Sequence, residues 1–216
     1  GHIDGFETYL ADLEGLIDEV FAAIAPPPYD LIGHSMGGHL ALRALLRRPD
    51  AFRRVVLSAP MVDLPVPGLV RRYALGASWV ARRLGLGAAA AFGRPIFTDP
   101  ESAAAWFTDN PLTGDRARYD AWADFNIANP DLRIDRGSYA WIGGAMRSMA
   151  ASLPHPILFI RGDGERIVSK SAIDAAAAAA PNGRGETLMG CRHEPMMEHA
   201  GVRERVFSTI KSYLNH

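Results

Sequence analysis

The feature that most limits how this chain can fold is a serine set among glycines where a strand meets a helix. Tyr29 to Ile32 is a short apolar run typical of a strand, and apolar residues recur at helical spacing from Gly38 to Pro49. Between them lies GHSMG, residues 33–37, which is the G-x-S-x-G pattern of a nucleophile elbow. Such a turn is so sharp that a side chain at either flanking glycine is expected to collide with the backbone. The pattern predicts a Ser35 hydroxyl exposed at a helix N-terminus, where amides and the helix dipole favour a developing negative charge.

A serine hydroxyl is a poor nucleophile until a base takes its proton, so the elbow predicts two partners further along the chain. The chain order for this motif is Ser, then Asp or Glu, then His. Ile157–Ile160 is a second apolar run, followed by RGDGERIVS, and Glu186–Met189 is a last one, followed by GCRHEPMME. Both loops follow strand ends, where α/β sheets place their chemistry. We therefore expect the partners in these two loops.

Three carboxylates compete for the role of the acid. Asp174 falls in an Ala-rich, helix-like run and is expected on a solvated face. Glu165 is preferred because Arg166-Ile167-Val168 follows it directly and the apolar pair can anchor the loop. Asp163 is the reserve candidate, although an Asp-Gly pair is also common turn chemistry.

His193 follows the last predicted strand, where the base belongs, whereas His34 is expected to line the site without transferring protons. The segment HEPMMEH, residues 193–199, also invites a zinc interpretation. A helical zinc motif needs histidines at i and i+4, but Met197 stands at that position and Pro195 interrupts a helix. No metal site and no other cofactor are expected.

The segment between the second and third predicted strands is too long for a structureless loop. We expect it to be a helical cap, residues 64–151, inserted into a core of residues 1–63 and 152–216. Its predicted helices are Leu69–Leu84, Pro100–Phe107, Arg116–Ala128 and Tyr139–Ala151. Its large aromatic residues are candidates, with His34, for an acyl-chain pocket: Trp79, Trp106, Phe107, Trp122, Phe125 and Trp141. The alternative is that they form the small core that any helical insert needs.

Composition excludes several classes of function. With 48% hydrophobic residues the chain can form a core, and its net charge of −1 gives no reason to expect nucleic-acid binding. Cys191 is the single cysteine, so no internal disulfide forms, and a packing role is favoured over a reactive thiol. Arg71-Arg72 and Arg82-Arg83 could meet lipid phosphates or form solvated faces. We expect a cytoplasmic protein or one in peripheral contact with a membrane.

Several segments together resemble the α/β-hydrolase superfamily, and within it the monoacylglycerol lipase and lysophospholipase L2 group of serine hydrolases. They are, in family order, GHIDGFETYLADL (1–13), LIGHSMGGHLALR (31–43), VVLSAPMVD (55–63), GERIVS (164–169) and RHEPMMEH (192–199). The resemblance implies a mostly parallel sheet flanked by helices, with a helical cap insert. The family's acid precedes an Arg-[Ile/Val]-Val step, which falls on Glu165, although Asp is the commoner acid there.

The resemblance also implies strands and a His-Gly oxyanion loop before the segment that begins at Gly1. We therefore expect the N-terminal strands of the family fold to be absent from this chain, which leaves the elbow strand with an unpaired edge. The Met36 backbone amide would supply one oxyanion donor, and the second is expected from that preceding loop.

The function implied is cleavage of carboxylic esters of single-chain acyl lipids, a lysophospholipid or a monoacylglycerol, through an acyl-enzyme. Alternatives with the same residues are a small-ester esterase, a haloperoxidase-like enzyme and a C–C hydrolase. A non-catalytic module of the same fold, which binds ligands, is the alternative from another class.

Overall fold

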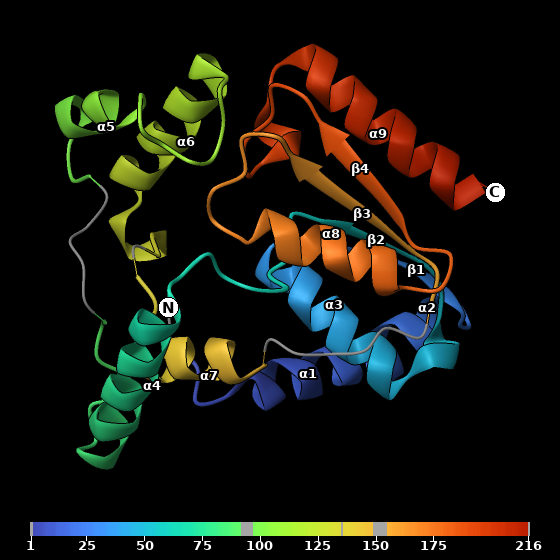
Figure 1. The fold of residues 1–216 in the computed structure, drawn as a ribbon, viewed down its shortest axis with the longest axis horizontal. Coiled ribbons are helices and arrows are strands. Elements are labelled where there is room, and N and C mark those ends of the chain that lie inside the picture. Colours follow the sequence, from blue (N-terminus) through green and yellow to red (C-terminus); the bar gives the residue numbers. More distant parts are fainter. Residues whose placement is uncertain (1, 92–96, 135, 149–154, 216) are drawn as a thin grey trace.

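Parallel strands form the central sheet, in the spatial order β1-β2-β3-β4 (Figure 1). The computed structural model describes residues 2–91, 97–134, 136–148 and 155–215. The strands are β1 Tyr29–His34, β2 Phe52–Ser58, β3 Ile157–Gly162 and β4 Arg184–Leu188. All four predicted strands are present, but β2 and β4 begin earlier than predicted, at Phe52 and Arg184. Arg53, Arg54 and Arg184 interrupt the apolar pattern at these ends, but the backbone there still pairs with the neighbouring strand.

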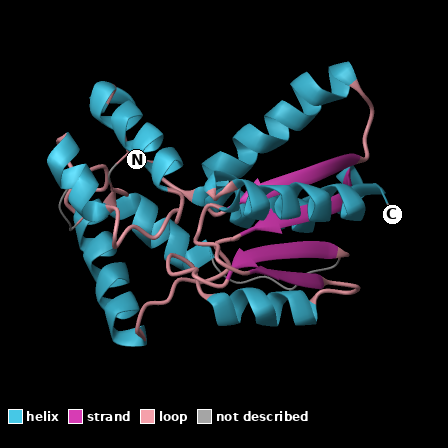
Figure 2. Cartoon of the chain, turned by 90° about the horizontal axis from the view of Figure 1, so that it is seen from above, coloured by secondary structure: helices cyan, strands magenta, loops and turns pink. Residues whose placement is uncertain are grey.

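Side chains alternate between the two faces of the sheet, as the strand pleat requires. Val55 and Leu57 of β2 face one apolar cluster, whereas Val56 between them faces another. The first cluster is covered by α1 (Phe6–Gly15), α3 (Met36–Arg47) and α8 (Lys170–Ala179). The second is covered by α9 (Ala200–Asn215), so helices flank both faces (Figure 2). This is the predicted α/β-hydrolase arrangement of a parallel sheet between helices.

Strand β1, which leads into the elbow, lies at an edge of the sheet. Among the described residues it pairs with β2 alone, and Ile32 in its centre is 47% exposed. The chain reaches β1 from α1 through a π-helical segment, Leu16–Phe21, and the short helix α2, Ala22–Ile24. The unpaired edge expected for the elbow strand is therefore present in the described part of the chain.

The insert between β2 and β3 is helical, as predicted. It contains α4 Gly68–Arg83, α5 Pro100–Trp106, α6 Arg116–Ala128 and α7 Tyr139–Ser148. Residues 149–151 of the last predicted helix, and the proposed domain boundary after residue 151, lie outside the described residues. The insert lies beyond the carboxyl ends of the strands (Figures 1 and 2). The division into core and cap stays a prediction.

Local sequence explains where the insert helices begin. The Asp99 side chain accepts a hydrogen bond from the Ser102 amide and forms a capping box before α5, whose first residue is Pro100. Asp115 caps α6 in the same way through the Arg118 amide. Short 3-10 turns at Pro49–Ala51, Pro130–Leu132 and Pro195–Met197 complete the described elements.

Candidate active site

Ser35 sits in a strained backbone conformation between β1 and α3. Its φ is 51° and its ψ is −119°, in a region that residues with a side chain rarely adopt. The end of β2 and the loop after it hold Ser35 there, because the Ser35 amide donates to Ser58 O (2.9 Å) and Ser35 O accepts from the Met61 amide (2.9 Å). These contacts stabilise the strained turn and place the Ser35 hydroxyl at the start of α3.

The glycines of the elbow differ from the sequence prediction in one respect. A Cβ on Gly33 would lie 2.8 Å from Gly37 O and from the Gly38 Cα, so a side chain is excluded there. A Cβ on Gly37 would have no neighbour within 4 Å, which contradicts the expected collision. The second crowded glycine is Gly38, whose Cβ would lie 2.9 Å from Pro60 Cβ. The close approach is thus between α3 and the loop after β2, which sequence spacing around Ser35 does not reveal.

His193 joins the elbow to the acid loop through both of its ring nitrogens. Its Nε2 lies 2.9 Å from Ser35 Oγ, and its Nδ1 lies 2.7 Å from Glu165 Oε2. His193 is 3% exposed, and its backbone amide donates to Pro111 O of the insert (3.1 Å). The structure thus brings together the three side chains that the sequence pattern singled out.

Glu165, rather than Asp163, reaches His193. The second carboxylate oxygen of Glu165 accepts hydrogen bonds from the amides of Ile167 (2.7 Å) and Val168 (3.1 Å). The Arg-Ile-Val step therefore anchors the Glu165 carboxylate through its backbone amides, and the Val168 side chain is buried as well. Burial of Glu165 opposes its ionisation, but the hydrogen bond to His193 and these amides outweigh burial and hold the pKa of the carboxyl below its usual range. Glu165 is consequently ionised at neutral pH.

Asp163 links the two loops instead. Its Oδ1 accepts from the amide of Gly164 (2.9 Å) and from that of Cys191 (3.1 Å), so it ties the acid loop to the histidine loop. The loops are so close that a Cβ on Gly162 would lie 2.1 Å from Cys191 O. Cys191 itself is buried, and desolvation raises the pKa of its thiol to about 12, which excludes a thiolate nucleophile at neutral pH.

In the sequence, Glu194 was considered only as part of a zinc motif, and its contact with His34 was not predicted. Its Oε1 lies 3.1 Å from Nε2 of His34, the residue before Ser35, and both side chains are partly exposed. The contact does not meet the geometry of a hydrogen bond from a ring N–H, and that buried nitrogen has no hydrogen-bond partner among the described residues. The His34 ring also lies 5.0 Å from the His193 ring. A carboxylate directly after the predicted base was the available signal.

These residues also form the cluster best able to hold a cation in the described part of the chain. One ligand atom from each of His34, His193 and Glu194 lies within 4.8 Å of the others. The zinc interpretation of residues 193–199 used His193, Glu194 and His199, of which His199 is not part of this cluster. Because both nitrogens of His193 already contact Ser35 and Glu165, a cation there would have to displace one of these contacts.

A segment of the insert, residues 109–114, is fastened to both loops. Arg166 of the acid loop and Arg192 of the histidine loop each donate to Asn110 O, at 3.2 and 2.7 Å. Glu198, fully buried, accepts from the amides of Arg192 (2.8 Å) and Gly114 (2.9 Å). The anchor depends on residues remote in sequence, so no local pattern predicts it.

The aromatic residues proposed for the pocket fall into separate groups. Trp106, Phe107 and Trp122 pack around Tyr119 in a small apolar cluster of α5 and α6. This is the packing expected of a helical core. Trp79 and Phe125 are 58% and 56% exposed, and Trp141 packs near Phe6 with ring centroids 6.0 Å apart. Whether any of them contacts an acyl chain stays a prediction.

The arginine pairs of α4 are largely engaged within the chain. Arg71 forms an ion pair with Asp63, Arg82 donates to Asp4 O (2.6 Å), and Arg83 lies over the Trp79 ring at 5.1 Å. No helix in the described ranges has the length and apolar character needed to span a bilayer.

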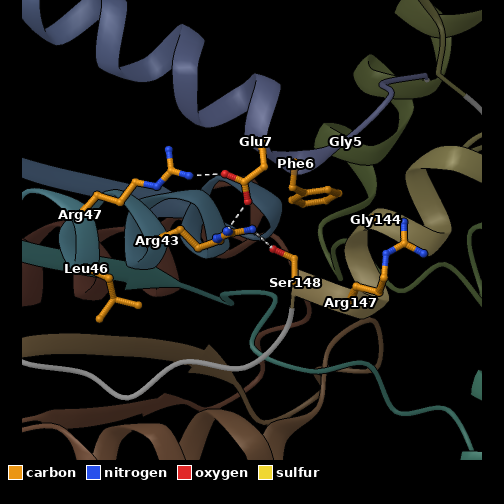
Figure 3. Close-up of a pocket in the computed structure, with 9 residues that line it drawn as sticks. All are labelled: Gly5, Phe6, Glu7, Arg43, Leu46, Arg47, Gly144, Arg147 and Ser148. Carbon is orange, nitrogen blue, oxygen red and sulfur yellow. Dashed lines mark hydrogen bonds and ion pairs between the residues drawn. The ribbon is translucent and has the colours of Figure 1, made fainter.

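A separate cavity of about 450 Å³ lies between α1, α3 and α7 (Figure 3). Arg43 and Arg47 line it and both pair with Glu7, while Arg43 also donates to Ser148 Oγ. His39 reaches the same Ser148 hydroxyl, with Nε2 2.7 Å from Oγ. These contacts hold the three helices together on the side of α3 that faces α1 and α7.

A strained serine after a parallel strand, a histidine and a carboxylate in loops at the carboxyl ends of neighbouring strands, and helices on both sheet faces define an α/β-hydrolase. The chain belongs to the family described as serine aminopeptidase, S33, whose model matches residues 1–200.

Relatives within this superfamily are similar along the whole chain. Lysophospholipase L2 of Escherichia coli (strain K12) is 26% identical over 233 residues, covering 100% of this chain and 66% of the relative. "Probable lysophospholipase L2" of Haemophilus influenzae is 25% identical over 221 residues, covering 100% of this chain and 68% of the relative. The chain therefore spans about two thirds of the length of these curated relatives.

Solved structures confirm the fold. The monoacylglycerol lipase of Paleococcus ferrophilus superimposes with a TM-score of 0.68 at 18% identity, covering 100% of this chain and 77% of that one. A soluble variant of the monoglyceride lipase of Saccharomyces cerevisiae gives a TM-score of 0.67, also at 18% identity, covering 95% of this chain and 68% of that one.

Proposed function

We propose that the protein is a serine hydrolase that cleaves carboxylic esters of single-chain acyl lipids, with Ser35 as nucleophile, His193 as base and Glu165 as acid. The observation that carries the proposal is the pair of contacts made by one imidazole, 2.9 Å to Ser35 Oγ and 2.7 Å to Glu165. This is the geometry needed to activate a hydroxyl. The lysophospholipase and monoacylglycerol lipase relatives support the substrate class.

The first half of the reaction forms an acyl-enzyme. Ser35 Oγ attacks the ester carbonyl while its proton passes to His193 Nε2, and the ionised Glu165 stabilises the imidazolium. The carbonyl oxygen becomes an oxyanion next to the Met36 amide, the first of α3 and one of those with no partner inside the helix. When the tetrahedral intermediate collapses, the ester C–O bond breaks and the leaving alcohol takes the proton from His193.

The second half repeats these steps with water. His193 removes a proton from water, the hydroxide attacks the acyl carbonyl, and Ser35 leaves with the proton returned by His193. The products are a fatty acid and an alcohol, and no redox step or cofactor is required.

Substitution of Ser35 tests the proposal. In the full-length protein, Ser35→Ala should lower kcat for a p-nitrophenyl acyl ester by roughly 10⁴-fold or more, because the nucleophile is lost. Labelling by a fluorophosphonate probe should disappear as well. Ser208→Ala, which removes an exposed hydroxyl on α9, is the matched control and should keep both activities. Probe labelling or substantial hydrolysis by Ser35→Ala would show that another residue is the nucleophile.

The probe also separates an enzyme from a binding module of the same fold. A module would leave Ser35 unlabelled although the three side chains are in contact. Contact with a lipid surface and a cytoplasmic location stay predictions.

A further inference from the structure

Two adjacent residues of the elbow face two adjacent residues of the histidine loop. Ser35 lies 2.9 Å from His193, and His34 lies 3.1 Å from Glu194. The backbone of Glu194 is held in place because its amide donates to Leu112 O (2.9 Å). The His34–Glu194 pair is therefore a fixed neighbour of the reacting groups, and its side chains are 31% and 28% exposed, so a ligand can reach them.

The mechanism places the leaving alcohol beside this pair. His193 Nε2 must deliver its proton to the leaving oxygen, so that oxygen comes within hydrogen-bond distance of Nε2. Ligand atoms of His34, Glu194 and His193 lie within 4.8 Å of one another. The first atoms of the head group consequently fall near the Glu194 carboxylate and the His34 ring.

The chemistry of the pair favours hydroxyl groups. Burial opposes ionisation of Glu194, but its contact with His34 and the neighbouring His193 ring outweigh burial and hold the pKa of the carboxyl below its usual range. An ionised carboxylate accepts hydrogen bonds from hydroxyls. The His34 side chain lies partly exposed beside this carboxylate and lines the same position.

The same carboxylate repels an anionic group. Of the cations in these loops, Arg166 and Arg192 donate to backbone carbonyls of the insert rather than to Glu194. The arginines of α4 that could have met a phosphate include Arg71 and Arg82, which bind Asp63 and Asp4 O. The charged group that the structure places beside His34 and His193 is thus the Glu194 carboxylate.

We infer that His34 and Glu194 form a head-group subsite that takes a neutral, hydroxyl-bearing alcohol and discriminates against one that carries a phosphate. The inference rests on the proposed function, and it selects monoacylglycerol over lysophospholipid as the preferred substrate class. Glu194 acts here as a specificity-determining residue.

A matched pair of esters tests it. The full-length protein is assayed with 1-decanoylglycerol and with 1-decanoylglycerol 3-phosphate, both kept monomeric, and decanoate release gives kcat/KM for each. The wild type should prefer the neutral ester. Glu194→Gln keeps the shape and removes the charge, and should lower the preference at least tenfold. Each unit of phosphate charge about 8 Å from the carboxylate contributes roughly tenfold at an effective dielectric constant of about 30, and the phosphate carries about 1.5 to 2 such charges at pH 7.

Controls separate charge from disruption of the loop. Glu194→Asp keeps the charge and should keep most of the preference, and Glu204→Gln removes an equivalent charge from an exposed position on α9 and should change nothing. Raising the ionic strength should weaken the wild-type preference, because salt screens the repulsion. This last measurement needs no variant and decides the matter if Glu194→Gln does not fold.

The outcomes are distinguishable. An unchanged preference in Glu194→Gln, or a wild type that cleaves the phosphate ester faster, overturns the subsite while the proposed function stands. If neither lipid is cleaved although Ser35 reacts with the fluorophosphonate, the proposed lipid esterase function is wrong, and the subsite falls with it.

Discussion

His39 should make the stability of the protein depend on pH, and the structure gives the size of the effect. The ring is 4% exposed in the first turn of α3. Burial, together with the charge of Arg43, lowers the pKa of His39 from 6.5 to about 4. The unfolded chain takes up a proton near pH 6.5, whereas the folded chain does so only near pH 4. The resulting stability is therefore fully present above pH 6.5 and is lost as the pH falls towards 4.

The linkage relation converts these two pKa values into a free energy of unfolding. The difference between the two pKa values corresponds to about 3 kcal/mol of unfolding free energy, of which about 2 kcal/mol is lost between pH 7 and pH 5. The groups around the ring explain why the pKa of His39 is lowered. The charge of Arg43 opposes protonation, the Phe6 ring packs edge-on at 5.6 Å, and Nε2 lies 2.7 Å from Ser148 Oγ. Because the His39 amide donates to Ser35 O (3.2 Å), loss of this packing should also disturb the elbow.

Urea unfolding of the full-length protein at pH 7, 6 and 5, followed by circular dichroism, measures the effect. His39→Gln does not titrate and keeps a hydrogen-bonding group for Ser148. Wild type should lose about 2 kcal/mol more than His39→Gln between pH 7 and pH 5. His155→Gln, at a loop histidine bonded to Pro49 O, is the control and should behave like wild type. Equal losses in wild type and His39→Gln, or an NMR titration of His39 near pH 6.5, would refute the reasoning.

Two further predictions concern the acid and the glycines. Glu165→Gln should lower kcat for a p-nitrophenyl ester by roughly 10³–10⁴-fold, because the imidazolium loses its carboxylate. Asp163→Asn, which weakens only a link between loops, should keep most of kcat with a lower melting temperature, and the opposite ranking would reverse the assignment. Gly33→Ala should destabilise the fold by about 1–3 kcal/mol through overpacking against backbone. Gly37→Ala, in open space within a helix, should be neutral or stabilising by up to about 1 kcal/mol, and equal melting temperatures for the two variants would contradict the difference in crowding between these glycines.

The strands, the insert helices and the elbow were predictable because they depend on neighbours in sequence. Short apolar runs located β1 and β3, and the helix predicted from Pro100 begins at that residue as α5. The boundaries of β2 and β4 were less accurate, since their first residues are held by pairing with another strand rather than by their own pattern.

Sequence alone determined that Ser35 stands in a strained turn, and that a carboxylate and a histidine follow in loops at strand ends. Tertiary structure decided which carboxylate meets the histidine. Asp163 and Glu165 are two positions apart and chemically equivalent, but only Glu165 receives the amides of its own loop on one oxygen and His193 on the other. Tertiary structure also decided the contact between His34 and Glu194, because it joins the end of β1 to a loop that is remote in sequence. Sequence patterns describe what a backbone does over a few residues, whereas the distance between loops depends on the packing of the whole sheet and its helices.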